Sequence, residues 1–160
     1  MDRFERFSAA ISEISRHWHR IASDEMEKYG LKGAHSVYLT TLYRCPEGMT
    51  AGRLCALCGK DKSDVSRMAA AMEKKGLMCK AGGHQNAYGG RLQLTEAGRA
   101  VAERVQRRAS LAVELAGAGL GEENREALYE ALEQIAVNLR EIAREGLPEG
   151  EEGSAELQSP

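Results

Sequence analysis

The stretch from Gly59 to Leu77 constrains the fold of this chain more than any other. Its apolar residues recur at the spacing of one helix face, and they are Val65, Met68, Ala69 and Met72. The opposite stripe has no bulky apolar side chain and consists of Ser63, Arg67, Ala70 and Lys74. Asp61 is a favoured N-cap residue, and Gly76 is a favoured residue just after a helix. The pattern predicts a short helix with one buried face and one cationic face.

The polar face of this helix suits the major groove of DNA. An arginine on such a face can reach the edge of a guanine, and a serine can reach a phosphate or a base. An ordinary solvated surface helix would show a similar pattern, because most surface helices carry charges on their outer face. The flanking sequence decides between these interpretations in favour of DNA.

The segments on either side complete a winged helix-turn-helix pattern. Thr50 is expected to cap a short helix that runs to Cys58, and a turn through Gly59 joins it to the helix with the cationic face. Residues 77–81 and 91–95 read as two strands around a loop with four glycines. A hairpin directly after a helix-turn-helix is a wing, and Leu92 and Leu94 are expected to face inward from it.

Two long helices at opposite ends of the chain each show a narrow apolar seam. The first seam alternates gaps of three and four residues at Phe4, Phe7, Ile11, Ile14, Trp18 and Ile21. The second seam lies at Leu128, Leu132, Ile135, Leu139 and Ile142. A helix with such a seam packs along another helix, either in the core of a monomer or between subunits. We favour subunit contact, because each seam has nothing else of similar length to meet.

The predicted fold class is mainly α, or α+β when the wing is counted. Two further helices are expected over 34–44 and from residue 95 to the glycine-rich break at 117–121. The predicted organisation is an N-terminal dimerisation helix over 1–30, a winged helix-turn-helix DNA-binding lobe over 31–98, C-terminal dimerisation helices over 99–146, and a disordered acidic tail over 147–160.

The net charge of −2 hides an asymmetry along the chain. Between Met49 and Arg99, nine Lys or Arg residues stand against four Asp or Glu residues, whereas 147–160 carries acids and no base. Local charge decides which partners a surface attracts, so the central segment favours a polyanion. No apolar run has the length of a membrane span or a signal peptide, so we expect a cytoplasmic protein without a membrane partner.

Several short motifs together match a known family. They are Thr50 with Leu54-Cys55, the run from Asp61 to Arg67, the run from Glu73 to Leu77, and the run from Leu94 to Gly98. On these residues the chain resembles the MarR family of bacterial winged-helix transcription regulators, over roughly Phe4 to Glu145. The resemblance implies a homodimer whose first, fifth and sixth helices intertwine. It also implies that Ser63, Asp64, Ser66 and Arg67 face DNA.

Nearby bases extend the predicted DNA-binding set. Lys62 and Lys74 are expected to contact phosphates, and the candidates on the wing are Lys80, His84 and Arg91. The wing of the family usually carries Asp-x-Arg near its tip, whereas the corresponding residues here are Asn86-Ala87-Tyr88. The wing therefore lacks the arginine with which the family usually reaches into the minor groove.

The resemblance also implies a small aromatic or phenolic effector, which family members bind in a crevice between the first, second and fifth helices. The candidates for lining that crevice are His17, Trp18, His35 and Tyr38. A metal held by Glu13 and His17, four residues apart on one helix face, is an alternative that we do not favour. We expect no metal and no cofactor.

The cysteine pair Cys55 and Cys58 forms a C-x-x-C motif. Such a pair can pack as two small hydrophobes, sense oxidants through its thiols, or bind a metal. We favour packing, because both residues lie on the inner side of the predicted helix and no second C-x-x-C follows.

Nothing in the sequence indicates catalysis. It contains no nucleophile elbow, and Gly59-Lys60 lacks the glycine spacing and the Ser or Thr of a phosphate loop. The sequence therefore predicts a protein that is not an enzyme: a dimeric repressor that binds a pseudo-palindromic operator and is released by a small molecule. The alternatives are a thiol-switched regulator and a winged-helix protein-interaction module that does not bind DNA.

Overall fold

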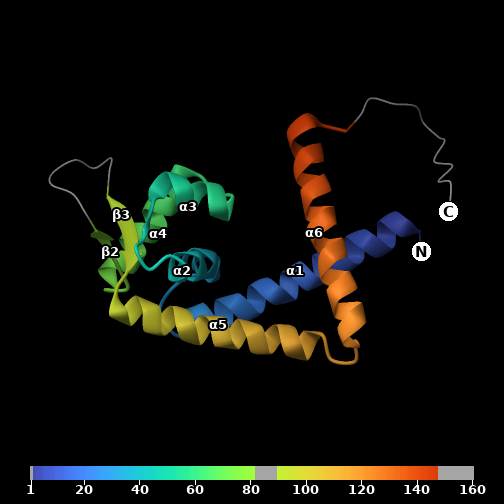
Figure 1. Cartoon of the computed structure of the whole chain (residues 1–160), viewed down its shortest axis with the longest axis horizontal. Coiled ribbons are helices and arrows are strands. Elements are labelled where there is room, and N and C mark those ends of the chain that lie inside the picture. Colours follow the sequence, from blue (N-terminus) through green and yellow to red (C-terminus); the bar gives the residue numbers. More distant parts are fainter. Residues whose placement is uncertain (1, 82–89, 148–160) are drawn as a thin grey trace. The chain divides into compact units, whose positions relative to one another are not determined.

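The computed structural model describes residues 2–81 and 90–147 and divides into two units, Met1–Leu115 and Ala116–Pro160 (Figure 1). The first holds α1 (Arg3–Glu27), a 3₁₀ turn η1 (Gly33–His35), α2 (Ser36–Tyr43), β1 (Met49–Thr50), α3 (Ala51–Cys58), α4 (Lys62–Lys74), β2 (Met78–Ala81), β3 (Arg91–Leu94) and nearly all of α5 (Glu96–Ala116). The second holds α6 (Glu122–Glu145). The predicted wing tip, His84 and residues 148–160 of the predicted tail lie outside the described residues.

The sheet has three antiparallel strands in the order β1-β3-β2. The hairpin β2–β3 was predicted, and it pairs Met78 with Leu94 and Ala81 with Arg91. Strand β1 was missed, because two residues are too short to show any periodicity. It pairs Met49 with Leu92 and so ties the start of α3 to the wing.

The helices match the sequence pattern with small differences at their ends. α1 begins with a capping box between Asp2 and Glu5 and ends three residues before Gly30, where we expected its end. The helix expected over 34–44 begins instead as the 3₁₀ turn η1 and becomes α-helical at Ser36. Helix ends fray or tighten into a 3₁₀ turn, which the periodicity of the sequence does not record.

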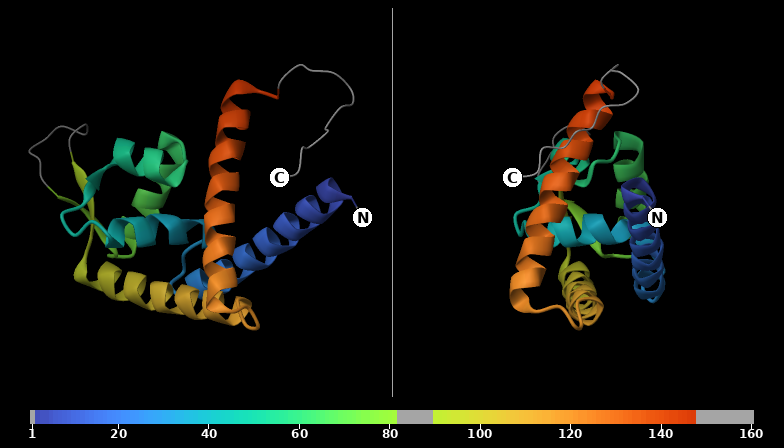
Figure 2. Two further views of the ribbon diagram at one scale, coloured as in Figure 1. Left: turned by 45° about the vertical axis from the view of Figure 1, so that its right-hand side comes forward. Right: turned by 90° about the vertical axis from the view of Figure 1, so that its right-hand side faces the viewer.

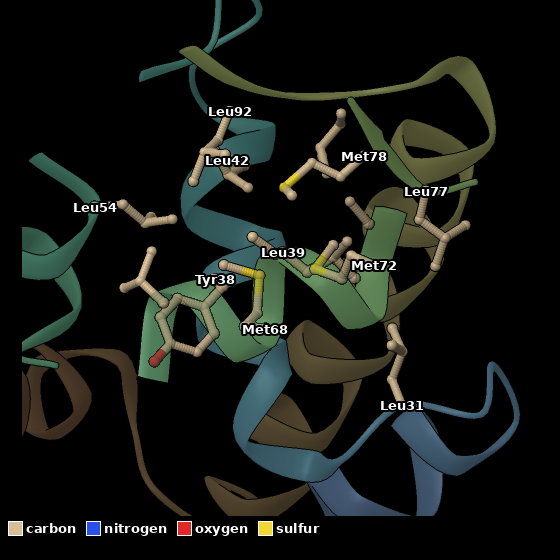
Figure 3. Packing of buried hydrophobic residues seen from close by; sticks show 14 of the residues in the cluster. Leu31, Tyr38, Leu39, Leu42, Leu54, Met68, Met72, Leu77, Met78 and Leu92 are labelled. Atoms are coloured by element: carbon tan, nitrogen blue, oxygen red, sulfur yellow. The ribbon is translucent and has the colours of Figure 1, made fainter. Parts of the chain in front are cut away.

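The core of the first unit lies where α2, α4 and the sheet meet (Figure 3). Met68 and Met72 of α4 point toward Leu39 of α2, and Leu92 of β3 lies beside Leu42. The buried apolar residues are Met26, Leu31, Tyr38, Leu39, Leu42, Met49, Leu54, Val65, Met68, Ala69, Met72, Leu77, Met78, Leu92, Leu94, Ala102 and Val105. Leu92 and Leu94 therefore face inward, as their alternation predicts.

Helix α5 runs along the lower edge of this lobe (Figure 2). Two hydrogen bonds join the residue before α5 to the segment that follows α4, and a third caps α5 itself. The Thr95 N–H donates to the Leu77 carbonyl at 3.1 Å, its hydroxyl donates to the Gly76 carbonyl at 2.7 Å, and the same hydroxyl oxygen accepts from the Gly98 N–H at 3.0 Å. The run from Leu94 to Gly98 is therefore a junction that fixes α4 against α5.

The C-terminal part of α1 joins the same lobe through the buried Met26 and through one largely buried carboxylate. Glu25 pairs with Lys28, the C-cap residue of α1, at 2.5 Å and with the Arg108 Nε of α5 at 3.7 Å. The residues of α1 from Arg3 to Ile21 are exposed. No helix in the described parts of the chain is long and apolar enough to cross a membrane.

In the second unit, α6 follows the loop 117–121, which the sequence predicted as a connection between two helices. Arg125 donates to the Gly117 carbonyl at 3.1 Å and so closes this loop onto the first turn of α6. Two acids, Glu122 and Glu123, occupy that first turn, where the helix dipole favours negative charge.

We expect Gly98→Ala to destabilise the protein by about 3 kcal/mol, because overpacking of a rigid site has costs of this order. A Cβ atom at Gly98 would lie 1.9 Å from the carbonyl oxygen of Leu77, which also accepts the hydrogen bond from Thr95. Urea unfolding followed by circular dichroism measures the change.

The matched control is Gly52→Ala in α3, where an added Cβ would meet no atom within 4 Å. It should stabilise the protein by about 0.5 kcal/mol, because alanine loses less backbone entropy than glycine in a helix. Equal effects from the two substitutions would contradict a specific close approach at Gly98.

Candidate nucleic-acid interface

The turn between α3 and α4 is tightly closed by backbone and cap hydrogen bonds. The Thr50 hydroxyl oxygen accepts from the Arg53 N–H at 3.3 Å and starts α3. Gly59 adopts a left-handed conformation, which lets the N–H groups of Gly59 and Lys60 return to the Cys55 carbonyl. Asp61 then caps α4 by accepting from the Asp64 N–H at 2.8 Å. The N-terminus of α4 is thus held in place by local contacts.

The buried side of α4 decides which of its side chains reach solvent. Val65, Met68, Ala69 and Met72 are all buried, as predicted. Ser63, Ser66, Arg67, Ala70 and Lys74 are consequently exposed together with Lys62 at the start of the helix. The structure therefore presents the predicted stripe of hydroxyl, guanidinium and ammonium groups to the surroundings.

Arg67 and Asp64 form an ion pair on this stripe. The Nη2 group of Arg67 donates to Oδ1 of Asp64, one turn earlier on the helix. Both side chains remain accessible, with exposed fractions of 70% for Arg67 and 42% for Asp64. The hydrogen bond to Asp64 and the charge of that carboxylate raise the pKa of Arg67, so the guanidinium stays charged.

The two described candidates on the wing are already engaged within the lobe. Lys80 of β2 forms an ion pair with Glu73 of α4 at 3.4 Å. Arg91 of β3 donates from Nε and Nη2 to the Gly48 carbonyl at 3.2 and 2.8 Å. Both cations therefore brace the base of the wing, whatever else they contact.

Arg53 and Lys60 were not singled out by the sequence pattern, although both are exposed at the ends of α3. They belong to the nine bases counted between Met49 and Arg99. Only their position in the helix-turn-helix could have marked them as DNA contacts. Ordinary surface charges occupy such positions as well, so the sequence did not single them out.

The effector candidates are placed differently from one another. His17 and Trp18 are exposed on α1, and Tyr38 is only 3% exposed within the core. Burial is the main cause that raises the pKa of Tyr38, followed by the nearby charge of Asp64. His35 ends η1, and its buried Nδ1 has no hydrogen-bond partner in the described structure. His35 is thus the candidate whose buried polar atom lacks a partner among the described residues.

The C-x-x-C cysteines are half-buried against the core, in the packing position that we favoured. The Cys58 thiol donates to the Thr41 hydroxyl oxygen at 3.7 Å, and burial raises the pKa of Cys58. A raised pKa lowers the thiolate fraction and therefore the reactivity. Among the described residues, no three His, Cys, Asp or Glu side chains are grouped so as to hold a metal ion.

No protein-family model matches the sequence, and no curated protein matches it. Solved structures do. A MarR transcriptional regulator from Methanosarcina mazei Go1 has a TM-score of 0.75 and 22% identity, over 89% of this chain and 94% of its own. A putative MarR family regulator from Listeria monocytogenes, complexed with 26mer DNA, has a TM-score of 0.76 and 22% identity, over 94% and 100%.

Another MarR family transcription regulator has a TM-score of 0.78 and 19% identity, over 91% of this chain and 95% of its own. The chain therefore has the winged-helix fold of the MarR-type regulators, which its sequence motifs predicted.

We expect the free energy of unfolding to decrease as the pH is lowered below about 6.5, in part because of His35. Burial and the charge of Lys32 lower the pKa of His35 from its ordinary 6.5, so the unfolded chain binds a proton more readily. The stability that comes from keeping His35 neutral is fully present above pH 6.5. It is lost as the pH falls through the lowered pKa of His35 in the folded state.

Urea unfolding between pH 5 and pH 7.5, at a fixed protein concentration, tests this expectation. His35→Gln should show a smaller loss of unfolding free energy on acidification than the unsubstituted protein. His17→Gln, at an exposed position on α1, is the control and should keep the original slope. Identical pH profiles for all three proteins would contradict the assignment to His35.

Proposed function

We propose that this protein is a sequence-specific, DNA-binding transcriptional regulator that acts as a homodimeric repressor. The observation that carries the proposal is the exposed face of α4, where Ser63, Ser66 and Arg67 stand on a helix whose other side is anchored in the core. A polar helix face held by a rigid scaffold is what major-groove recognition requires. The DNA complex of the similar Listeria monocytogenes protein supports this direction.

The contacts divide into two kinds. Arg67 reads a base edge, and Ser63, Asp64 and Ser66 lie beside it on the same exposed turn. Lys62 and Lys74 contact phosphates, which adds affinity with little sequence preference. Lys80 and Arg91 hold the base of the wing next to the DNA backbone. The wing tip and His84 lie outside the described residues, so no role is built on them.

The uncovered seam of α1 supports homodimerisation. Its six apolar residues are between 41% and 73% exposed in the single chain. The described surfaces of α6 add Leu128, Leu132, Leu139 and Ile142, which are exposed as well. Apolar surface of this extent is typical of a subunit interface, and a second copy of the chain supplies a matching seam. A symmetric dimer places two α4 helices in successive major grooves, about 34 Å apart, on a pseudo-palindromic operator.

A small aromatic or phenolic effector releases the repressor in this proposal. The unpartnered Nδ1 of His35 near α1 is the described group best suited to bind it, with Trp18 and His17 on α1 as further contacts. Release requires that the effector bind more tightly to a dimer whose α4 helices no longer match the groove spacing. The protein acts in the cytoplasm and needs neither catalysis nor a cofactor for this role.

The rival function is a protein-interaction module that does not bind DNA. The salt dependence of DNA affinity distinguishes the two functions. Counterion release makes DNA binding weaken steeply as salt rises. Fluorescence anisotropy with duplexes from the region upstream of the gene, at about 50 mM and 200 mM salt, should show a loss of at least about a hundredfold in affinity. Absence of salt-dependent binding would favour the interaction module.

We expect Ile14→Glu to weaken the dimer by roughly a hundredfold or more, because each interface then buries two carboxylates in an apolar seam. Ile14 is 63% exposed in the single chain, so the substitution should leave the lobe folded. Ala9→Glu adds the same charge on the opposite face of α1 and is the control. Sedimentation equilibrium at micromolar concentration measures both. If Ile14→Glu dimerises as tightly as Ala9→Glu, the apolar seam of α1 is not the subunit interface.

Arg67→Ala should reduce the ratio of operator to random-DNA affinity by about tenfold, because a good arginine–guanine contact contributes discrimination of that order. Lys74→Ala should instead weaken binding to both DNAs alike and lower the salt slope by about one. Titration of each variant with selected and random duplexes measures the ratio. A uniform loss in Arg67→Ala would remove Arg67 from base reading.

A further inference from the structure

Asp64 is an acidic residue on a surface that the proposed function brings against DNA. It lies on the exposed turn that carries Ser63 and Arg67, and its side chain is 42% exposed. A carboxylate in such a place repels phosphates and so lowers affinity for any DNA. The residue therefore weakens binding in general unless it does something specific.

The structure excludes helix capping as the main role of the Asp64 side chain. The cap of α4 is Asp61, whose carboxylate accepts from the backbone N–H of Asp64. The Asp64 carboxylate accepts instead from Arg67. Its location in the first turn also suits the helix dipole, but that effect requires only a negative charge and no particular partner.

Simple masking of Arg67 by Asp64 is too weak to matter. An exposed pair three residues apart on a helix changes an equilibrium by about twofold. At the DNA surface, where water is excluded, the same ion pair is stronger, and there it acts on the orientation of Arg67. A free arginine side chain loses rotamer entropy when it is fixed against a base. A carboxylate that already holds one Nη group makes this entropy loss smaller. Because Asp64 engages Nη2, the rest of the guanidinium fork can face a guanine O6 and N7.

We propose that Asp64 is a positioning and specificity residue: it aligns the Arg67 guanidinium for a guanine edge and, through its own charge, disfavours the use of Arg67 on phosphates. Asp64 thereby lowers affinity for random DNA and raises discrimination. This inference rests on the proposed DNA-binding function.

The test begins with a duplex selected from a library with a randomised centre by the unsubstituted protein. Dissociation constants are then measured by anisotropy for this duplex, for versions with each guanine replaced, and for a random duplex. Asp64→Asn should tighten random-duplex binding by about threefold and increase its salt slope by about one, because Arg67 becomes available to phosphate. The selected-to-random ratio should fall by about tenfold.

The control for charge alone is Glu47→Gln, which removes one exposed carboxylate in the segment before β1. It should shift all duplexes alike. The control for the partner is Asp64→Asn in an Arg67→Ala background, where the ratio should change by less than about twofold. Asp64→Ser repeats the test without a side-chain amide, and circular dichroism verifies that each variant is folded.

The outcomes separate the two levels of the proposal. If the unsubstituted protein shows no salt-dependent binding to any duplex, the proposed function fails. If it binds and discriminates, but Asp64→Asn shifts all duplexes equally or acts the same without Arg67, the role of Asp64 is wrong. A loss of discrimination that depends on Arg67 supports it.

Discussion

The burial of one side of α4 against α2 and the sheet is the contact on which the rest depends. Val65, Met68 and Met72 leave solvent, and the helix can then rotate very little about its own axis. Each remaining residue of α4 is thereby fixed toward the core or toward solvent. The direction of Arg67 is set by the packing of Met68 beside it, since both lie on the same rigid helix.

Hydrogen bonds at both ends keep this helix from sliding along its axis. The Asp61 cap and the left-handed Gly59 define its start. At its other end, Leu77 returns a hydrogen bond to Met72, while Thr95 binds the carbonyls of Gly76 and Leu77. The wing is attached at the same junction, so α4 and the base of the hairpin behave as one body. A rigid body of this kind can hold side chains in a groove at low entropic cost.

Charge on this surface is less uniform than the base count suggests. Asp64 pairs with Arg67, Glu73 pairs with Lys80, and Arg91 is directed to the Gly48 carbonyl. Three cations in the central segment therefore have partners inside the lobe, whereas Lys62 and Lys74, at the two ends of α4, form no ion pair with any residue that the structure describes. In the proposed function, affinity and discrimination therefore depend on different residues of one helix.

The sequence by itself determined the helices, the hairpin and the inward and outward sides of α4, because periodicity and end-capping residues act within a few positions along the chain. It also placed the cysteines in packing positions and located the seams of α1 and α6. Tertiary structure alone decided that Met49 and Thr50 form a strand and that Arg91 and Lys80 brace the wing. Each of these depends on a partner far away in sequence, such as Leu92 for Met49 or Gly48 for Arg91, and no local pattern carries that information.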